Sequence, residues 1–200
     1  VEYLLFLILF SFPMILGRGA EAIVEKTETG VAKRRMAKSY RHPDLDKRLR
    51  QFRTRREATV LEKLPINGPR LLSVDDSDMV IEMEFLDGQQ LRDVLKQDNA
   101  DQYMQQLATM LKKLHKAGIV HGDLTTSNIM VVDEQLYLID FGLGQFSDHV
   151  EEYAVDLHLL KHAFEAKHPD LSLWKPFWEF YDADEELVDQ FAKVESRGRY

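Results

Sequence analysis

The sequence contains no cysteine. This absence excludes a disulfide framework, a cysteine zinc site and a cysteine nucleophile. Long apolar runs are also scarce, because the nearly continuous run from Leu4 to Leu16 is too short for a typical membrane span. That run has neither the basic start nor the small-residue cleavage site of a signal peptide. We therefore expect no integral membrane association, the alternative being a membrane anchor in this run.

The chain also has no overall excess of positive charge. Its formal net charge is −8, which argues against non-specific binding of nucleic acid by the whole surface. Residues 33–56 are the exception, because they hold eleven Lys or Arg residues and two Asp residues. A local basic segment on an acidic protein can still bind a polyanion. With 44% hydrophobic residues, the 200-residue chain can bury a substantial core.

Two motifs stand in the order and spacing of a protein-kinase active site. Residues 121–128 read His-Gly-Asp-Leu-Thr-Thr-Ser-Asn, and residues 140–142 read Asp-Phe-Gly. Phosphoryl transfer from ATP needs a carboxylate to orient the attacking hydroxyl and oxygen ligands for Mg²⁺. We predict Asp123 for the first role, and Asn128 and Asp140 for the second. An isolated Asp-Phe-Gly or a polar loop is common, but the pair of motifs favours the kinase interpretation.

The segment between the motifs supports this interpretation. Two apolar runs, 129–132 and 136–139, flank a short polar stretch and predict a β-hairpin that holds Asn128 beside Asp140. Upstream, a first strand is expected near Met14, and small residues follow it. Their backbone could contact the phosphates of a nucleotide, and a hairpin without that role is an equal alternative. The candidate residues of this nucleotide-binding turn are Gly17, Gly19, Ala20 and Glu21. Ala22 replaces the third glycine of the usual pattern.

A lysine and a glutamate are predicted to complete the nucleotide site. Lys33 follows two small apolar residues on an expected strand, and Arg34 and Arg35 are its competitors. A helix is expected from Pro43 to about Leu64. Glu57 lies within its apolar arc and is predicted to pair with Lys33, the alternative being one of many nearby arginines. That arc contains Leu45, Leu49, Phe52, Val60, Leu61 and Leu64.

A strand is expected over residues 79–88. In this register Met83 would lie behind the adenine, and the backbone of Glu84 and Leu86 would face the base edge. Helices are predicted over 100–116 and 152–167 from their apolar spacing. His121 is interpreted as a packed structural residue, and Asp156 as a brace for the catalytic-loop backbone.

Parts of a regulated kinase are missing from the pattern. Gly122 stands where His-Arg-Asp has a basic residue, and no Ala-Pro-Glu follows Gly142. There is no room for a long activation segment that phosphorylation would order. We expect a constitutively assembled or partner-controlled enzyme. The fold class is α+β, a minimal bilobal protein-kinase-like fold with a β-rich N-lobe, one main N-lobe helix and a reduced helical C-lobe.

The chain resembles the small atypical kinase subunits of the KEOPS complex, also called EKC, which are the PRPK-type kinases. The resemblance covers nearly everything from Gly17 onward. The segment before Gly17 and the last residue, Tyr200, depart from the family pattern. The motifs that carry the resemblance are 19–22, 38–43, 53–58, 121–128, 140–144, 154–157 and 197–199.

The resemblance implies ATP and Mg²⁺ as cofactors, autophosphorylation on Ser or Thr, and ATP hydrolysis within a complex that installs threonylcarbamoyl on tRNA adenosine. It also implies a peptidase-like partner subunit, a small regulatory subunit, and a location in the cytoplasm, the nucleus or both. Transfer RNA would contact the tail at residues 197–199, the alternative being a solvated terminus. The basic segment 33–56 would serve tRNA or an acidic partner surface. The working residues would be Lys33, Glu57, Asp123, Asn128 and Asp140.

Four segments are expected along the chain: an uncertain apolar segment 1–16, an N-lobe 17–86, a reduced C-lobe 87–195 and a basic tail 196–200. Two other functions stay open. His-Gly-Asp also occurs in small-molecule kinases of the aminoglycoside and choline type, although those need a large helical substrate lobe after the metal-binding turn. A non-catalytic nucleotide-binding scaffold is the second, although it would not need Lys33, Asp123, Asn128 and Asp140 together.

Overall fold

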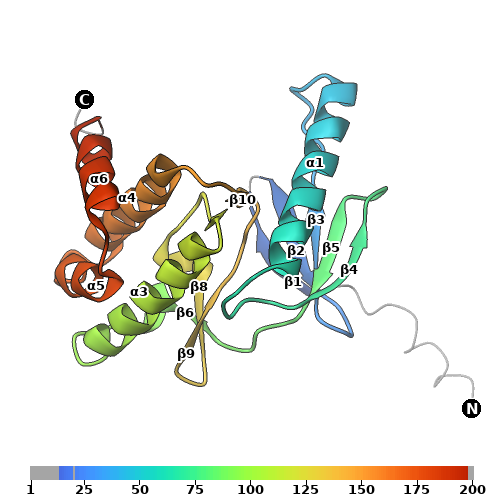
Figure 1. The fold of residues 1–200 in the computed structure, drawn as a ribbon. Coiled ribbons are helices and arrows are strands. Elements are labelled where there is room, and N and C mark those ends of the chain that lie inside the picture. Colours follow the sequence, from blue (N-terminus) through green and yellow to red (C-terminus); the bar gives the residue numbers. More distant parts are fainter. Residues whose placement is uncertain (1–13, 20, 198–200) are drawn as a thin grey trace, which may run out of the picture. The chain divides into compact units, whose positions relative to one another are not determined.

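The structure is a computed structural model that describes residues 14–19 and 21–197. Figure 1 shows its helices and strands. The chain divides into two compact units. Of the described residues, the first unit comprises 14–19, 21–54 and 71–85, and the second comprises 55–70 and 86–197.

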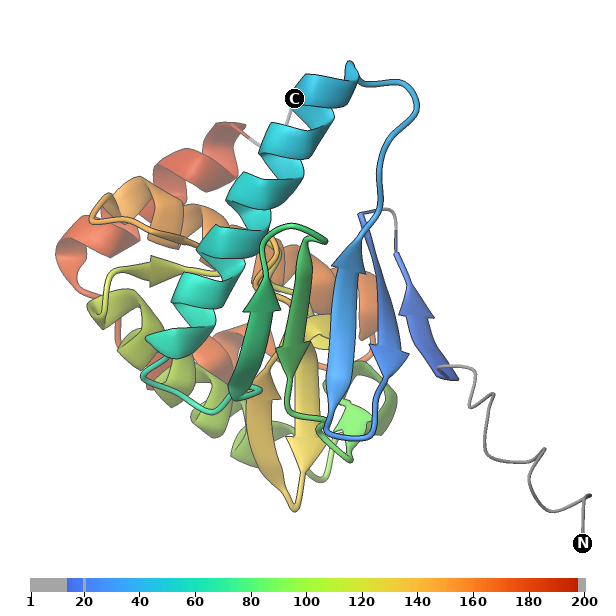
Figure 2. The same cartoon turned by 90° about the vertical axis from the view of Figure 1, so that its right-hand side faces the viewer.

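The first unit is built on an antiparallel sheet. Its described strands lie in the order β1-β2-β3-β5-β4, as seen in Figure 2. Gly30 precedes β3, and a Cβ atom there would lie 2.2 Å from the backbone oxygen of Met83 on β5. Only glycine permits that approach. The strands are β1 (Met14–Arg18), β2 (Ala22–Lys26), β3 (Val31–Arg35), β4 (Leu71–Asp75) and β5 (Val80–Met83).

The expected strand over 79–88 is shorter in the structure. Strand β5 ends at Met83, which pairs with Val31, the first residue of β3. Beyond this point β3 offers no further ladder partner, so the strand cannot continue on that side. At its other end Met79 has a positive φ of 54°, which marks the turn from β4.

Helix α1 (Pro43–Glu62) forms as predicted from Pro43, but its apolar face was predicted wrongly in the first half. Leu45 and Phe52 are 52% and 58% exposed, whereas Asp46 and Thr54 are buried. The buried face is therefore polar in this half of the helix. Asp46 can be buried there because its carboxylate accepts a 2.7 Å hydrogen bond from Arg50 Nε one turn later. Val60 and Leu61 are buried as expected.

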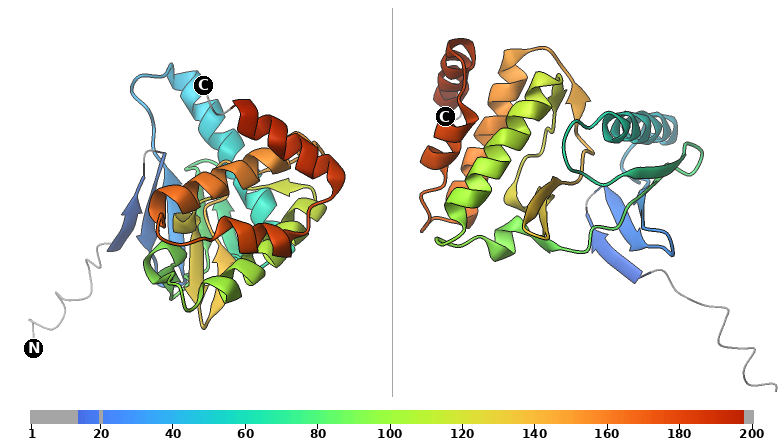
Figure 3. Two further views of the ribbon diagram at one scale, coloured as in Figure 1. Left: turned by 90° about the vertical axis from the view of Figure 1, so that its left-hand side faces the viewer. Right: turned by 60° about the horizontal axis from the view of Figure 1, so that its bottom comes forward.

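The second unit contains helices and short sheets. Helix α3 packs against α5, and α4 packs against α6, as the right view in Figure 3 shows for α4 and α6. The helices are α2 (Leu91–Val94), α3 (Ala100–Lys116), α4 (Val150–Lys167), α5 (Trp174–Tyr181) and α6 (Glu185–Arg197), with a 3-10 turn η1 (Thr126–Asn128). The strands are β6 (Gln89–Gln90), β7 (Ile119–Val120), β8 (Ile129–Val132), β9 (Gln135–Leu138) and β10 (Gln145–Phe146).

The predicted hairpin and both predicted C-lobe helices are confirmed. Strands β8 and β9 pair antiparallel through a two-residue turn at Asp133 and Glu134, and both turn residues have positive φ. Such a turn matches the twist of the strands that it joins. Helix α3 has the predicted bounds, and α4 begins two residues earlier than expected, at Val150.

The core of the second unit is apolar and aromatic. On α3 the side chains of Met104, Leu107 and Leu111 have no exposed surface. Trp174 on α5 stacks on Phe191 of α6, with ring centroids 5.2 Å apart. Among the described residues, no helix is long and apolar enough to cross a membrane.

Candidate active site

Asp123 and Asn128 lie together in the loop between β7 and β8. The amide nitrogen of Asn128 donates to the backbone oxygen of Asp123 at 2.8 Å and to its carboxylate Oδ2 at 3.1 Å. The 3-10 turn η1 makes this possible, since it brings residues five apart in sequence back to one another. The Asp123 side chain is exposed.

Asp156 holds the start of the catalytic loop from helix α4. Its carboxylate accepts the backbone N–H of His121 at 2.6 Å and that of Gly122 at 2.8 Å. The side chain is fully buried. A buried carboxylate with two backbone donors is a strong and directional brace. The predicted bracing role of Asp156 is therefore confirmed.

His121 is a packed residue with a defined tautomer. Its Nδ1 accepts the backbone N–H of Asp123 at 3.3 Å, so the proton lies on Nε2, which donates to the Ile139 carbonyl at 3.0 Å. The ring lies against Phe141, with centroids 4.8 Å apart. His121 therefore links the catalytic loop to the Asp-Phe-Gly turn, and both its side chain and that of Phe141 are fully buried.

His115 is a positioning residue that the sequence motifs do not indicate. Its Nδ1 lies 2.8 Å from Tyr181 Oη, and its Nε2 lies 3.4 Å from Asp156 Oδ2. Burial raises the pKa of Tyr181, and the nearby carboxylates of Asp184 and Asp156 add to this shift, so the phenol keeps its proton and donates to His115. The available signal was a histidine next to Leu114 on the buried face of α3.

Asp140 follows the hairpin directly. The N–H of Ile139 donates to the Asn128 carbonyl at 2.9 Å, which places the residue before Asp140 opposite Asn128. Asp140 has a left-handed backbone with φ of 62°, and its carboxylate accepts the Gly142 N–H at 3.2 Å. Aspartate tolerates this conformation because its short side chain bonds locally. The structure thus brings Asp123, Asn128 and the Asp-Phe-Gly turn to one region of the second unit.

The donor set in this region fits Mg²⁺. Asn128 uses its amide nitrogen on Asp123, so its amide oxygen is the atom that would bind a metal. Asp140 is exposed and supplies a carboxylate. Carbonyl and carboxylate oxygens are the ligands that Mg²⁺ prefers.

Gly122 is required by its surroundings. Its φ is +79°, and a Cβ atom at this position would lie 2.8 Å from the Leu143 carbonyl oxygen. That same carbonyl accepts a hydrogen bond from Arg56 Nη2 at 3.4 Å. A side chain at position 122, such as the arginine of His-Arg-Asp, would collide with the segment after the Asp-Phe-Gly turn.

The candidate lysine lies in the first unit. Lys33 and Arg35 are buried at 6% and 5% exposure on strand β3, whereas Arg34 is exposed and lies 3.9 Å from Asp78. Lys33 pairs in register with Val24 and Ile81. Glu57 is buried on the part of α1 that belongs to the second unit. The Lys33–Glu57 pair stays a prediction.

The expected nucleotide turn connects β1 to β2. Gly19 N–H donates to the Ala22 carbonyl at 2.9 Å, which closes the turn, and Gly17 lies at a bulge in β1. Ala20 lies outside the described residues. Glu21 accepts hydrogen bonds from Arg53 at 2.9 Å and from Arg41 at 3.4 Å. This carboxylate is therefore tied to two guanidinium groups.

The expected adenine contacts follow β5. Met83 is buried at the end of this strand, Glu84 is exposed, and Leu86 begins the part of the chain that belongs to the second unit. In the first unit, Lys26 Nζ lies 4.2 Å from the centroid of the Phe85 ring. The roles of these residues toward a base stay predictions.

The sequence is similar to those of known proteins. The protein kinase domain family matches residues 10–160. The KEOPS complex subunit Bud32 of Pyrococcus abyssi is 38% identical over 184 residues, which cover 85% of this chain and 84% of that protein. A probable bifunctional tRNA threonylcarbamoyladenosine biosynthesis protein of Methanocorpusculum labreanum is 42% identical over 192 residues, covering 92% of this chain and 35% of that protein. The chain thus spans about a third of the length of the bifunctional relative.

A solved structure shares the fold. The Rio2 kinase from Chaetomium thermophilum aligns with a TM-score of 0.66 at 17% identity, over 92% of this chain and 72% of that chain. Its complex with ADP, Mg²⁺ and phosphoaspartate aligns with a TM-score of 0.58 at 19% identity, over 92% and 65%. The predicted protein-kinase-like α+β fold is confirmed.

Proposed function

Because the chain belongs to the KEOPS subunit Bud32 family and carries a protein kinase domain, we propose that it is an atypical serine/threonine kinase and ATPase that supports threonylcarbamoyl modification of tRNA. The observation that carries the proposal is the Asp123–Asn128 pair, joined at 2.8 and 3.1 Å and braced from behind by Asp156. This arrangement presents one carboxylate and one amide oxygen from a rigid loop.

Each working residue has one role in the proposal. Asp123 accepts a hydrogen bond from the attacking hydroxyl or water and so orients it toward the γ-phosphate. Asn128 and Asp140 hold Mg²⁺, which neutralises charge on the phosphates when it is bound. Lys33 contacts the α- and β-phosphates, and Glu57 orients Lys33.

The remaining nucleotide contacts come from backbone and small residues. The turn of Gly17, Gly19, Ala20 and Glu21 covers the phosphates. Backbone groups of Glu84 and Leu86 bind the adenine edge, with Met83 behind the base. These assignments rest on the order of the motifs along the chain.

We also propose that the protein works within a complex. Its partners are a peptidase-like subunit and a small regulatory subunit, by analogy with the relative named as a KEOPS complex subunit. Transfer RNA contacts the basic segment 33–56 and the C-terminal tail, of which residues 198–200 lie outside the described part of the chain. We expect this role in the cytoplasm, the nucleus or both.

The test is Mg²⁺-dependent phosphate release from radiolabelled ATP. Wild type, Asp123→Ala and Asp140→Ala are assayed alone, then with a KEOPS peptidase-like partner and tRNA. We expect weak release alone and more in the mixture, with a loss of about 10²-fold or more in either variant because general-base and metal contacts act in the transition state. Autophosphorylation is followed in the same samples.

Asp148→Ala is the matched control. This substitution removes the same negative charge at a side chain that is 98% exposed. Equal turnover in wild type and both active-site variants would exclude the assigned roles. ATP binding without release in any mixture would instead indicate a nucleotide-binding scaffold. Turnover by the isolated protein equal to that of the mixture would contradict the dependence on partners.

A further inference from the structure

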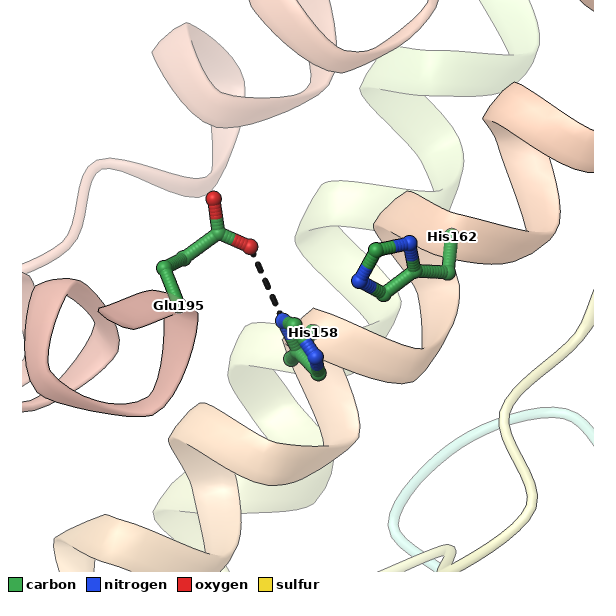
Figure 4. A group of neighbouring side chains, drawn as sticks. All are labelled: His158, His162 and Glu195. Carbon is green, nitrogen blue, oxygen red and sulfur yellow. Dashed lines mark hydrogen bonds and ion pairs between the residues drawn. The ribbon is translucent and has the colours of Figure 1, made fainter. Parts of the chain in front are cut away.

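A second group of side chains that could bind a metal ion lies outside the candidate active site. In the described part of the chain, His158 and His162 on α4 and Glu195 on α6 bring one ligand atom each to within 4.8 Å of one another. Figure 4 shows the three side chains converging on the space between the two helices. None of the three has a role in the function proposed above.

The helical spacing explains why the two histidines converge. Residues four apart lie on the same face of a helix, one turn above the other. The rings of His158 and His162 meet edge to face, with centroids 4.3 Å apart. Because α6 packs against α4, Glu195 reaches this face from the neighbouring helix.

A hydrogen bond between His158 and Glu195 already brings two possible ligand atoms together. His158 Nδ1 lies 2.8 Å from Glu195 Oε1. Zinc holds nitrogen and oxygen ligands at about 2.0–2.2 Å in a tetrahedron, which places two ligand atoms about 3.4 Å apart. A small outward movement of the two side chains would therefore let a metal ion replace the shared proton.

His162 has the environment of a zinc ligand. Its Nδ1 lies 3.4 Å from Glu165 Oε2 on the same helix. A ligating histidine commonly donates its other ring N–H to a carboxylate, which fixes the tautomer and makes the ligating nitrogen more basic. With Nδ1 facing Glu165 at this ion-pair distance, Nε2 is the nitrogen that would ligate the metal. The His162 side chain is 55% exposed, so its ring can rotate toward the other two ligands.

Lys161 places a positive charge against this group. Its ammonium bonds Glu195 Oε2, and it also lies 5.8 Å from the ring centroids of both Trp174 and Phe191. These aromatic faces stabilise the ammonium independently of Glu195. The lysine thus occupies one oxygen of Glu195 and leaves Oε1 directed at His158. Its charge opposes a cation and limits the affinity of the site.

We propose that His158, His162 and Glu195 form a Zn²⁺ site that links α4 to α6. Imidazole and carboxylate ligands suit Zn²⁺, and three protein ligands leave a fourth position for water. The site would fix α6 to the same helix that carries Asp156, two residues before His158. A metal bound here stabilises the helix pair and the support of the catalytic loop.

The test measures metal binding directly on the full chain. Metal-free wild type is titrated with Co²⁺ and followed by visible absorption, which reports a tetrahedral site. Zn²⁺ is then added in competition, and the thermal midpoint is recorded with and without Zn²⁺. The same titrations use His162→Ala, which removes an exposed ligand and keeps the His158–Glu195 bond. All are repeated in an Asp140→Ala background to remove the contribution of the catalytic metal.

We expect tetrahedral Co²⁺ bands and a Zn²⁺-dependent rise in midpoint in wild type. His162→Ala should weaken binding by about tenfold or more, since even an outer partner of a ligand is worth that much. His149→Ala is the matched control, an exposed histidine one residue before α4, and it should bind like wild type. Equal Zn²⁺ affinity in wild type and His162→Ala, or no tetrahedral spectrum in wild type, would overturn the proposal.

Discussion

Single residues decide the shape of the catalytic loop. Asp156 accepts two backbone N–H groups, from His121 and Gly122, and so holds the residues just before Asp123. Gly122 is the second such residue, because its backbone is left-handed and close to the Leu143 carbonyl. The Asp156 carboxylate and the absence of a side chain at Gly122 therefore position Asp123, the proposed catalytic residue.

We predict that Gly122→Ala destabilises the protein by about 1–3 kcal/mol. The added Cβ would combine a left-handed backbone with a 2.8 Å approach to the Leu143 carbonyl oxygen, so the loop must shift. Urea unfolding measures the change, and ATP turnover should fall with it. Gly19→Ala is the control for the unfolding free energy alone, since its nearest contact is 3.7 Å but Gly19 belongs to the proposed nucleotide-binding turn. Equal unfolding free energies in the two variants would contradict this account.

Helix α1 shows that an element can be anchored by charge as well as by apolar packing. Asp46 is buried near its start and bonds Arg50 at 2.7 Å, while the Lys38 N–H donates to it at 3.3 Å. Burial opposes the charged form of Asp46, but these hydrogen bonds and the charges of Arg50 and Arg41 outweigh it. The pKa of Asp46 therefore lies below its ordinary value.

A pH dependence follows for α1. Because the pKa of Asp46 is lower in the folded protein, its contribution to stability is present above about pH 3.8 and is lost as pH falls through the folded value. We expect Asp46→Asn to be less stable than wild type at neutral pH, with the difference shrinking below about pH 3.8. Unfolding free energies across this range measure it. Asp44→Asn, in the same turn but 90% exposed, should show little difference at any pH.

The distribution of charge over the whole molecule determines which surfaces can meet a polyanion. In the basic segment, Glu21 holds Arg41 and Arg53, and Asp46 holds Arg50. These guanidinium groups are partly neutralised. Lys47 and Arg48 are exposed on α1 and are the basic groups that we expect to contact tRNA phosphates.

We predict that the double variant Lys47→Glu with Arg48→Glu weakens tRNA binding by the assembled complex. The slope of log affinity against log salt should fall by about one for each phosphate that the variant no longer binds. Fluorescence anisotropy at several salt concentrations measures both quantities. Lys175→Glu with Lys193→Glu makes the same charge change on exposed sites of α5 and α6 and is the control. An equal reduction of affinity in the two double variants would show that only net charge matters.

The sequence predicted the residues of the candidate site and most of the helices and strands. The spacing of Asp123, Asn128 and Asp140 specified a kinase loop, and the apolar periodicity specified α3, α4 and the β8–β9 hairpin. These features are local, because hydrogen-bonded turns and helix faces depend on residues a few positions apart. The motifs also identified the family, through specific segments spread from residue 19 to residue 199.

Tertiary structure alone decided the features that join residues far apart in sequence. Sequence spacing could not show that His115 bonds Tyr181 and Asp156, or that Leu143 excludes a side chain at position 122. It also misplaced the apolar face of α1, since an apolar residue is buried only where a neighbouring element covers it. The His158, His162 and Glu195 cluster likewise exists only because α6 packs on α4 and brings a residue more than thirty positions away into contact.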